Sequence, residues 1–191
     1  MKKTILLLML AFAVSCTEDT QNQEVLDSQN FHFNSLKNSL DFQISKVAFE
    51  YSNTSDLETK VALFSKQLVQ ESLELVREKE SKIGYVTTYL SFDNKAASIE
   101  GFAYYDKQGK LLESSFADQR NSDPLEELLD GASCPSGYTR LGRCSNFGNT
   151  QACVGEYLAD YLSENLDSVG DCANVQISVG TLNTTVCGKT C

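Results

Sequence analysis

The sequence has no tryptophan, two prolines and a single histidine among its 191 residues. With one histidine, a histidine-rich zinc site is excluded, and a Ser-His-Asp or Cys-His centre would have to use His32. Because His32 lies between Phe31 and Phe33, we expect a local structural role for it and not a catalytic one. The neighbouring carboxylates of Glu126 and Glu127 point to different sides of a helix, and no glycine-rich phosphate loop occurs. We therefore predict no enzyme activity, no cofactor and no metal site.

Runs of positive charge and long apolar runs are also missing. The chain has 16 Lys and Arg residues against 26 Asp and Glu residues, which gives a formal net charge of −10. This balance argues against binding to nucleic acid or to anionic lipid head groups. The longest apolar stretch, residues 4–14, would span only about half of a bilayer core as a helix. The sequence therefore predicts no membrane-spanning helix.

The first fifteen residues instead have the pattern of a secretory signal peptide. Lys2 and Lys3 precede the apolar stretch, and the small residues of Ala13-Val14-Ser15 end it directly before Cys16. Ordinary cleavage after Ser15 would leave Cys16 as a free thiol. Such a thiol is a liability in an oxidising compartment.

Residues 13–16 resemble the lipobox of bacterial lipoproteins. The resemblance implies that Cys16 carries a diacylglycerol and becomes the new N-terminus, so that the lipid is the membrane anchor. The cysteine count supports this assignment, because lipidation of one of the seven cysteines leaves an even number. Glu18 and Asp19 resemble the signal that sends lipoproteins of Bacteroidota-type bacteria to the outer face of the outer membrane, although they also suit an ordinary solvated linker. We expect residues 16–30 to be a flexible tether to this membrane.

Residues 31–120 predict an α+β domain. Apolar residues recur at steps of three and four in a first segment, at Phe33, Leu36, Leu40, Ile44, Val47 and Tyr51, which predicts one helix. Ser55 and Glu58 form a capping box, which predicts the start of a second helix over residues 55–82. Residues 85–92, 98–105 and 111–116 are rich in β-branched and aromatic residues and are separated by turn sequences. We therefore expect an N-terminal helix pair packed on a three-stranded antiparallel meander, followed by a linker helix over residues 121–133.

Residues 134–191 predict a small six-cysteine module. Its cysteines are Cys134, Cys144, Cys153, Cys172, Cys187 and Cys191. No CxxC pair is present, so three structural disulfides are favoured over a zinc or redox site, with fifteen pairings left open. We expect residues 134–144 to be a turn-rich loop, 149–166 a helix and 174–187 a hairpin.

These features favour a noncatalytic, membrane-anchored surface lipoprotein that acts as a structural or partner-binding module. A contact patch for a protein partner is expected in the first loop of the six-cysteine module, at Tyr138, Arg140, Leu141, Arg143 and Phe147, because aromatic residues and arginine are favoured at interfaces.

One alternative function is that of an accessory lipoprotein that binds a glycan or another ligand. The eight tyrosines would permit it, and the absence of tryptophan weakens it. Another alternative is an inhibitor or immunity-type lipoprotein whose acidic surface blocks a basic partner.

Overall fold

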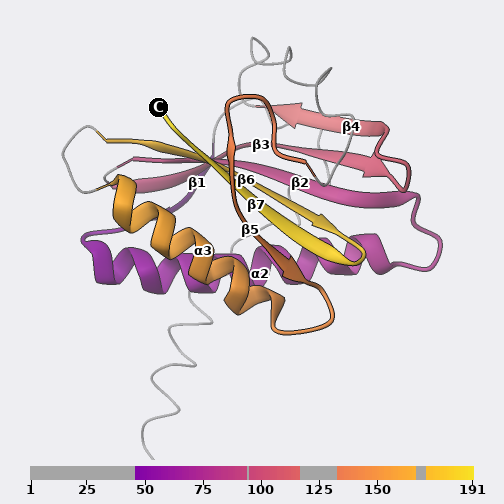
Figure 1. Cartoon of the computed structure of the whole chain (residues 1–191), viewed down its shortest axis with the longest axis horizontal. Coiled ribbons are helices and arrows are strands. Elements are labelled where there is room, and N and C mark those ends of the chain that lie inside the picture. The colour runs from indigo at the N-terminus through magenta and orange to yellow at the C-terminus, as the bar shows by residue number, and fades with distance from the viewer. Residues whose placement is uncertain (1–45, 94, 117–132, 167–170) are drawn as a thin grey trace, which may run out of the picture. The chain divides into compact units, whose positions relative to one another are not determined.

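The computed structural model describes residues 46–93, 95–116, 133–166 and 171–191. In these ranges the chain forms β1 (Lys46–Glu50), α2 (Thr54–Arg77), β2 (Ile83–Phe92), β3 (Ala96–Asp106), β4 (Leu111–Phe116), β5 (Thr139–Ser145), α3 (Thr150–Asn165), β6 (Ala173–Gly180) and β7 (Asn183–Thr190). The seven strands form one antiparallel sheet in the order β1-β3-β2-β6-β7-β5, and β4 pairs with β3 beside this path (Figure 1). The predicted α+β class is confirmed.

The predicted N-terminal helix pair is wrong. Residues 46–50 form β1, which pairs with β3 through Lys46 and Ile99, where the sequence pattern had predicted the end of a helix. Val47, assigned to the apolar helical stripe, is 60% exposed, and Phe49, outside that stripe, is 7% exposed. The pattern misled because a β-bulge between Val47 and Phe49 interrupts the alternation that marks a regular strand. The other residues of that stripe, up to Ile44, lie outside the described residues.

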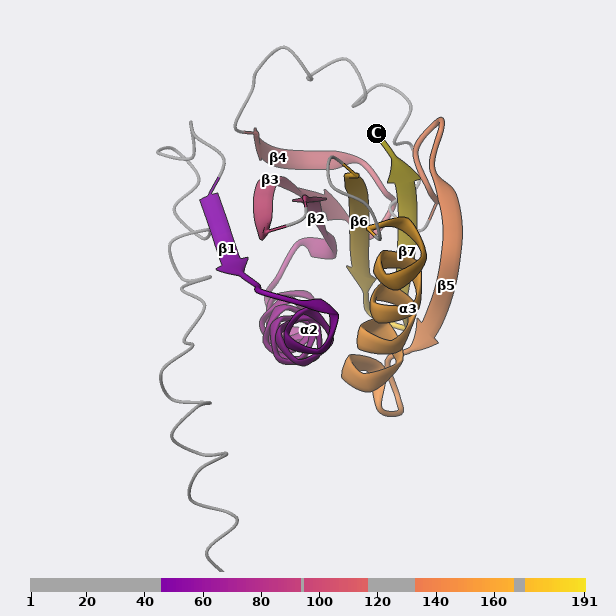
Figure 2. The ribbon, with the colours of Figure 1, turned by 90° about the vertical axis from the view of Figure 1, so that its left-hand side faces the viewer.

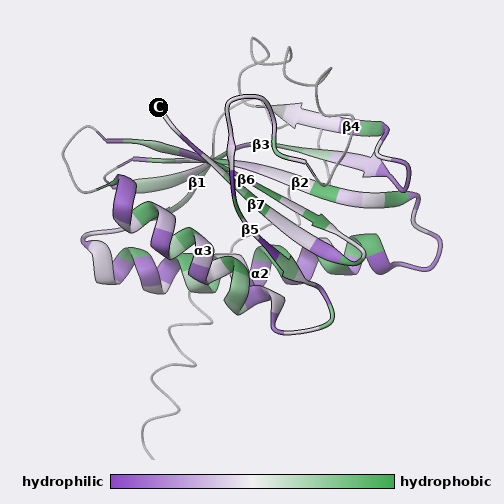
Figure 3. Cartoon of the chain, viewed as in Figure 1, coloured by the Kyte–Doolittle hydropathy of each residue, from purple (hydrophilic) through white to green (hydrophobic). Residues whose placement is uncertain are grey.

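Helix α2 lies where the second helix was predicted, but its cap differs. The side chain of Asn53 accepts a hydrogen bond from the Asp56 backbone N–H at 3.0 Å, so Asn53 and not Ser55 is the N-cap. Ser55 already lies inside the helix and cannot form the expected capping box. The buried residues recur at helical spacing along one side of α2, and hydrophilic and hydrophobic residues alternate along both helices (Figure 3).

The meander β2-β3-β4, the helix α3 and the hairpin β6-β7 confirm the corresponding predictions. The meander and the hairpin belong to one sheet, because β2 pairs with β6 from Tyr85 opposite Gly180 to Phe92 opposite Ala173. The sheet therefore contains strands from both the expected α+β domain and the expected six-cysteine module. Residues 1–30, predicted as signal peptide and tether, and residues 121–132 of the predicted linker helix lie outside the described residues.

The segment predicted as a turn-rich loop contains a strand, which corrects that prediction. Residues 139–145 form β5, the sheet edge that pairs with β7, with Arg143 opposite Thr185. This strand has few apolar residues, and its partner lies about forty residues away in sequence, so local periodicity gave no signal of it.

Both helices pack against the same face of the sheet, which we call the helix face (Figure 2). Its buried strand residues include Val86, Leu90, Phe92, Val175, Ile177, Val179 and Val186. Phe49 packs against Phe64 of α2 and Phe92 of β2, with ring centroids 5.5 and 6.3 Å apart. Each such side chain contributes about 1.5–3 kcal/mol through burial. This core holds the sheet in place, so that the residues of the opposite face keep fixed positions.

Side chains on the opposite face alternate with those of the core, and we call it the tyrosine face. Tyr105 and Ala103 are buried there and pack against Tyr85, Tyr89 and Leu111. Burial raises the pKa of the Tyr89 hydroxyl, with the neighbouring Tyr105 hydroxyl adding to the shift. Tyr105, Ala103 and the residues around them form a second, smaller packed layer on the sheet.

Candidate functional site

The six cysteines of the C-terminal part form three disulfides, as predicted, and the structure selects the pairing. Cys134 is bonded to Cys187, Cys144 to Cys153 and Cys172 to Cys191. Within the described residues, no group of three or more His, Cys, Asp or Glu side chains is placed to hold a metal ion. The disulfides tie three different places of the β5-β6-β7 half of the sheet, which stiffens the region where the candidate site lies.

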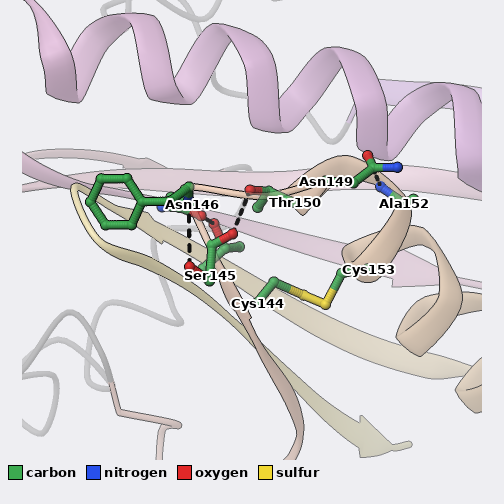
Figure 4. Close-up of a disulfide and its surroundings, with 9 residues drawn as sticks. Cys144, Ser145, Asn146, Asn149, Thr150, Ala152 and Cys153 are labelled. Atoms are coloured by element: carbon green, nitrogen blue, oxygen red, sulfur yellow. Dashed lines mark hydrogen bonds between the residues drawn. A yellow bond between two sulfur atoms is a disulfide. The ribbon is translucent and has the colours of Figure 1, made fainter.

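The Cys144–Cys153 bond joins the end of β5 to the first turn of α3 (Figure 4). Between them, the Thr150 hydroxyl donates to the Ser145 carbonyl at 2.9 Å, and Asn149 caps the helix by accepting from the Ala152 N–H. The backbone next to Cys144 is thereby fixed on two sides. Arg143 directly precedes this cysteine, so its backbone is held in place by the disulfide.

The predicted contact patch is only partly brought together. Arg140 and Arg143 are exposed, and their partners in β7, Cys187 and Thr185, are two residues apart, so both arginines project from the tyrosine face. Leu141 instead packs against the core of the helix face.

The two aromatic members of the predicted patch lie in different surroundings from each other. Tyr138 is half-buried, and burial raises the pKa of its hydroxyl. Phe147 follows β5 in the loop before α3 and is 78% exposed. The structure thus separates Leu141, on the helix face, from Arg140 and Arg143 on the tyrosine face, and Arg143 lines a cavity there.

This cavity, of about 370 Å³, lies at the end of the sheet where β2 begins and the β6-β7 hairpin turns. It is lined by Gly84, Tyr85, Lys107, Arg143, Ser178, Gly180, Thr181, Leu182, Asn183 and Thr185. The lining therefore comes from β2, the β3-β4 turn, β5 and the hairpin. Its volume is at the lower end of the range typical of small-molecule sites.

The charge of the cavity is opposite to that of the chain. Lys107 and Arg143 line it and no Asp or Glu does, although the whole sequence has a net charge of −10. Neither cation forms an ion pair with another residue of the described part of the chain. The ion pair found there joins Lys60 and Asp56. Both charges are therefore available to an anionic group from solution.

The turn that carries Lys107 has a defined conformation. The Asp106 carboxylate accepts hydrogen bonds from the Gln108 and Lys110 N–H groups, each at 2.9 Å. Gly109 follows at a positive φ of 83°, which glycine adopts without strain. This arrangement confirms the predicted turn and positions Lys107 in the lining of the cavity.

Two glycines make room for the other lining groups. A Cβ atom on Gly180 would lie 2.7 Å from Cε1 of Tyr85, so the tyrosine ring rests directly on the glycine backbone. A Cβ atom on Gly84 would lie 2.6 Å from the Lys107 Cα atom. Larger residues at these two positions would displace Tyr85 and the Lys107 turn, and would change the shape of the cavity.

The wall formed by the hairpin turn is held by Asn146, which is 5% exposed. Its side-chain amide donates to the Gly180 carbonyl at 2.6 Å, and its amide oxygen accepts from the Thr184 hydroxyl at 2.8 Å. Its backbone N–H donates to the Leu182 carbonyl at 2.9 Å. The turn is thus bonded to the loop after β5 at three points.

The other lining groups of the cavity are mostly polar and can form hydrogen bonds. Hydroxyl and amide groups come from Ser178, Thr181, Asn183 and Thr185, and the Ser178 and Thr87 hydroxyls lie 3.0 Å apart. No carboxylate, histidine or cysteine lines this cavity. It offers positive charge, hydrogen-bonding groups and one aromatic ring.

A second, more open depression of about 610 Å³ lies between α2 and α3. It is lined by Glu58, Ala62, Leu63, Lys66, Asn149, Gln151, Ala152, Gly155, Glu156 and Ala159. The small residues let the helices approach closely, since a Cβ atom on Gly155 would lie 3.5 Å from the Ala62 Cα atom. Its lining contains both acidic and basic side chains, so it does not favour a ligand of one charge. We therefore attribute this depression to helix packing.

Sequence reasoning identified Arg143 but missed Tyr85, Lys107 and the turn around Gly180. Their segments had been assigned only structural roles, as strand and turn. The cavity forms where β2 meets β6, a pairing between residues about ninety apart, so no local pattern could reveal it. Cys16 lies outside the described residues, and neither described helix has the length and apolar character needed to cross a bilayer.

Comparison with known proteins identifies no relative. The chain matches no protein-family model, no curated protein and no solved structure at a significant level. Function must therefore be argued from the geometry of the site.

Proposed function

We propose that this chain is a noncatalytic, lipid-anchored module that binds a small ligand in the cavity of the tyrosine face. Of the functions considered from the sequence, this is the ligand-binding accessory lipoprotein. The observation that carries the proposal is the cavity with Lys107 and Arg143 in its wall and no acid, in a strongly acidic chain. Such a local reversal of charge is better explained by a bound anion than by solubility, which the acidic remainder already provides.

Rigidity of the site supports the same function. Arg143 is next to the disulfide-bonded Cys144, and Thr185 is two residues from the disulfide-bonded Cys187. A site held in its binding geometry loses little conformational entropy when a ligand binds. In this proposal the disulfides therefore keep the binding site in place before a ligand arrives.

The proposed location follows from the sulfur chemistry. Three disulfides suggest an extracytoplasmic protein, because disulfides persist in oxidising compartments. We propose that Cys16 carries the lipid, and that the acidic tether behind it directs the protein to the outer face of the outer membrane. A binding module in this position would meet ligands from outside the cell.

A glycan array tests the proposal, with the full mature lipoprotein in detergent as the probe. The array should present neutral and acidic saccharides. We expect binding that is lost in the Arg143→Gln/Lys107→Gln variant and kept in Arg140→Gln, because Arg140 lies on the same strand and face but does not line the cavity. An array without any bound saccharide, or binding that the double variant leaves unchanged, would overturn the proposed function.

A further inference from the structure

The charges of the cavity indicate what kind of ligand it selects. Arg143 and Lys107 approach it from β5 and from the β3-β4 turn, so an acidic group inside it meets cations from two elements. A guanidinium group can bind a carboxylate or sulfate through two parallel hydrogen bonds, and an ammonium group adds a point charge. No carboxylate lines the cavity, and the Asp106 carboxylate next to Lys107 accepts hydrogen bonds from backbone N–H groups of its own turn.

The remainder of the lining suits the hydroxylated ring of a sugar. Tyr85 is half-buried, and its ring is supported from behind by the backbone of Gly180. An aromatic ring held in this way offers an apolar surface for the C–H face of a saccharide. Thr181 and Asn183 provide exposed or half-exposed polar groups beside it, which can replace water at sugar hydroxyls.

We infer that the cavity binds an acidic saccharide, with the sugar ring on Tyr85 and the acidic group within reach of Arg143 and Lys107. This inference rests on the proposed function and specifies its ligand. The acidic group is a carboxylate, as in a uronic acid, or a sulfate ester. A neutral sugar would leave both cations without a partner and would bind more weakly.

Matched glycosides test the inference by isothermal titration calorimetry on the full mature lipoprotein in detergent. Methyl β-D-glucuronide and methyl β-D-glucoside differ only in the acidic group, and glucose 6-sulfate tests the sulfate form. We expect at least one acidic sugar to bind tenfold or more tightly than the glucoside, since a charge-assisted hydrogen bond is worth about one to two orders of magnitude in affinity. Its affinity should fall as sodium chloride is added, because both cations are exposed.

Variants identify the groups responsible. Arg143→Gln should weaken binding of the acidic sugar by about tenfold or more and reduce its preference over the glucoside. Arg140→Gln should change the affinity less than about twofold, because salt screens a charge outside the cavity. Tyr85→Leu should weaken acidic and neutral sugars alike, whereas Tyr85→Phe, which keeps the ring and preserves the fold, should bind as the wild type does.

The outcomes separate this inference from the proposed function. Binding of neutral glycosides that requires Tyr85, with no gain for either acidic sugar, overturns the acidic-saccharide inference and leaves a ligand-binding module. An acidic preference that Arg140→Gln and Arg143→Gln reduce equally overturns the assignment to this cavity. Absence of any binding by these sugars and on the glycan array overturns both.

Discussion

The side-chain amide of Asn146 donates a hydrogen bond of 2.6 Å to the carbonyl of Gly180, across 34 residues of sequence. This contact joins the loop after β5 to the turn between β6 and β7. The Asn146 carbonyl also accepts a hydrogen bond of 2.6 Å from the Arg77 guanidinium at the end of α2. One buried asparagine therefore connects a helix, a loop and the wall of the cavity.

Asn146→Ala should lower the free energy of unfolding by about 2–3 kcal/mol, because it leaves two buried partners, the Gly180 carbonyl and the Thr184 hydroxyl, without their hydrogen bonds. Urea denaturation followed by circular dichroism measures this loss. Phe147→Ser is the control, because the neighbouring phenylalanine is 78% exposed and its loss should cost less than about 0.5 kcal/mol. Equal stability of the two variants would mean that Asn146 does not hold the turn.

Two of the disulfides should differ in their contributions to stability. The Cys134–Cys187 bond closes a loop with a sequence separation of 53, and the Cys144–Cys153 bond one of 9. On the chain-entropy account, these loops correspond to about 4 and about 2.5 kcal/mol. Cys134→Ala/Cys187→Ala should therefore unfold at lower urea concentration than Cys144→Ala/Cys153→Ala.

The comparison is matched because each bond has one cysteine that is 1% exposed, Cys187 in the first and Cys144 in the second. The packing lost with the buried sulfur is thus similar in both double variants. If Cys144→Ala/Cys153→Ala proved the less stable, native contacts at the junction of β5 and α3 would outweigh the entropy of loop closure.

The parts of the fold that were predictable are those whose signal is local. Helices α2 and α3 have buried residues at helical spacing, and the segments of β2, β3 and β6 are rich in β-branched and aromatic residues. Turn chemistry located the β3-β4 connection through Asp106 and Gly109. These signals act within about ten residues, so they do not depend on the remainder of the chain.

The unpredicted parts depend on distant partners. Strand β5 forms because the edge of β7 provides its hydrogen-bonding partners. Strand β1 likewise pairs with β3, which also pairs with β4. The pairing of β2 with β6 also joins two segments whose different cysteine content had suggested two modules. The cavity arises from this pairing. Sequence patterns therefore could not predict its position, although they had indicated Arg143 as a contact residue.

Alkaline pH should destabilise the fold through buried tyrosines. Burial, reinforced by the Glu113 carboxylate, raises the pKa of Tyr104 to about 12, whereas an unfolded tyrosine ionises at about 10. Between these two values the unfolded chain releases a proton that the folded chain retains, so the free energy of unfolding falls as the pH rises. This stability is fully present below about pH 10.

Urea denaturation between neutral and strongly alkaline pH, compared for wild type and Tyr104→Phe, measures this effect. The variant should lose less stability over the alkaline range, because phenylalanine has no proton to release. Its ring should still pack against Phe102, whose centroid lies 5.3 Å from that of Tyr104. Parallel pH profiles of the two proteins would show that Tyr104 ionises freely in the folded state.

The intact mass of the mature protein, measured with and without reduction, should show the chemical state of all seven cysteines. If Cys16 carries the lipid anchor, the chain begins at that residue and its mass exceeds the peptide mass by that of the acylated glyceride. Reduction should then add six hydrogens for the three disulfides and leave the thioether-linked lipid in place. A Cys16→Ser variant, which cannot form the thioether, should lack the added mass and leave the membrane fraction, while its six C-terminal cysteines still oxidise. A mature chain that starts at Cys16 with an unmodified thiol would contradict the lipid anchor and leave the disulfide-bonded fold unaffected, because the two depend on different sulfur atoms.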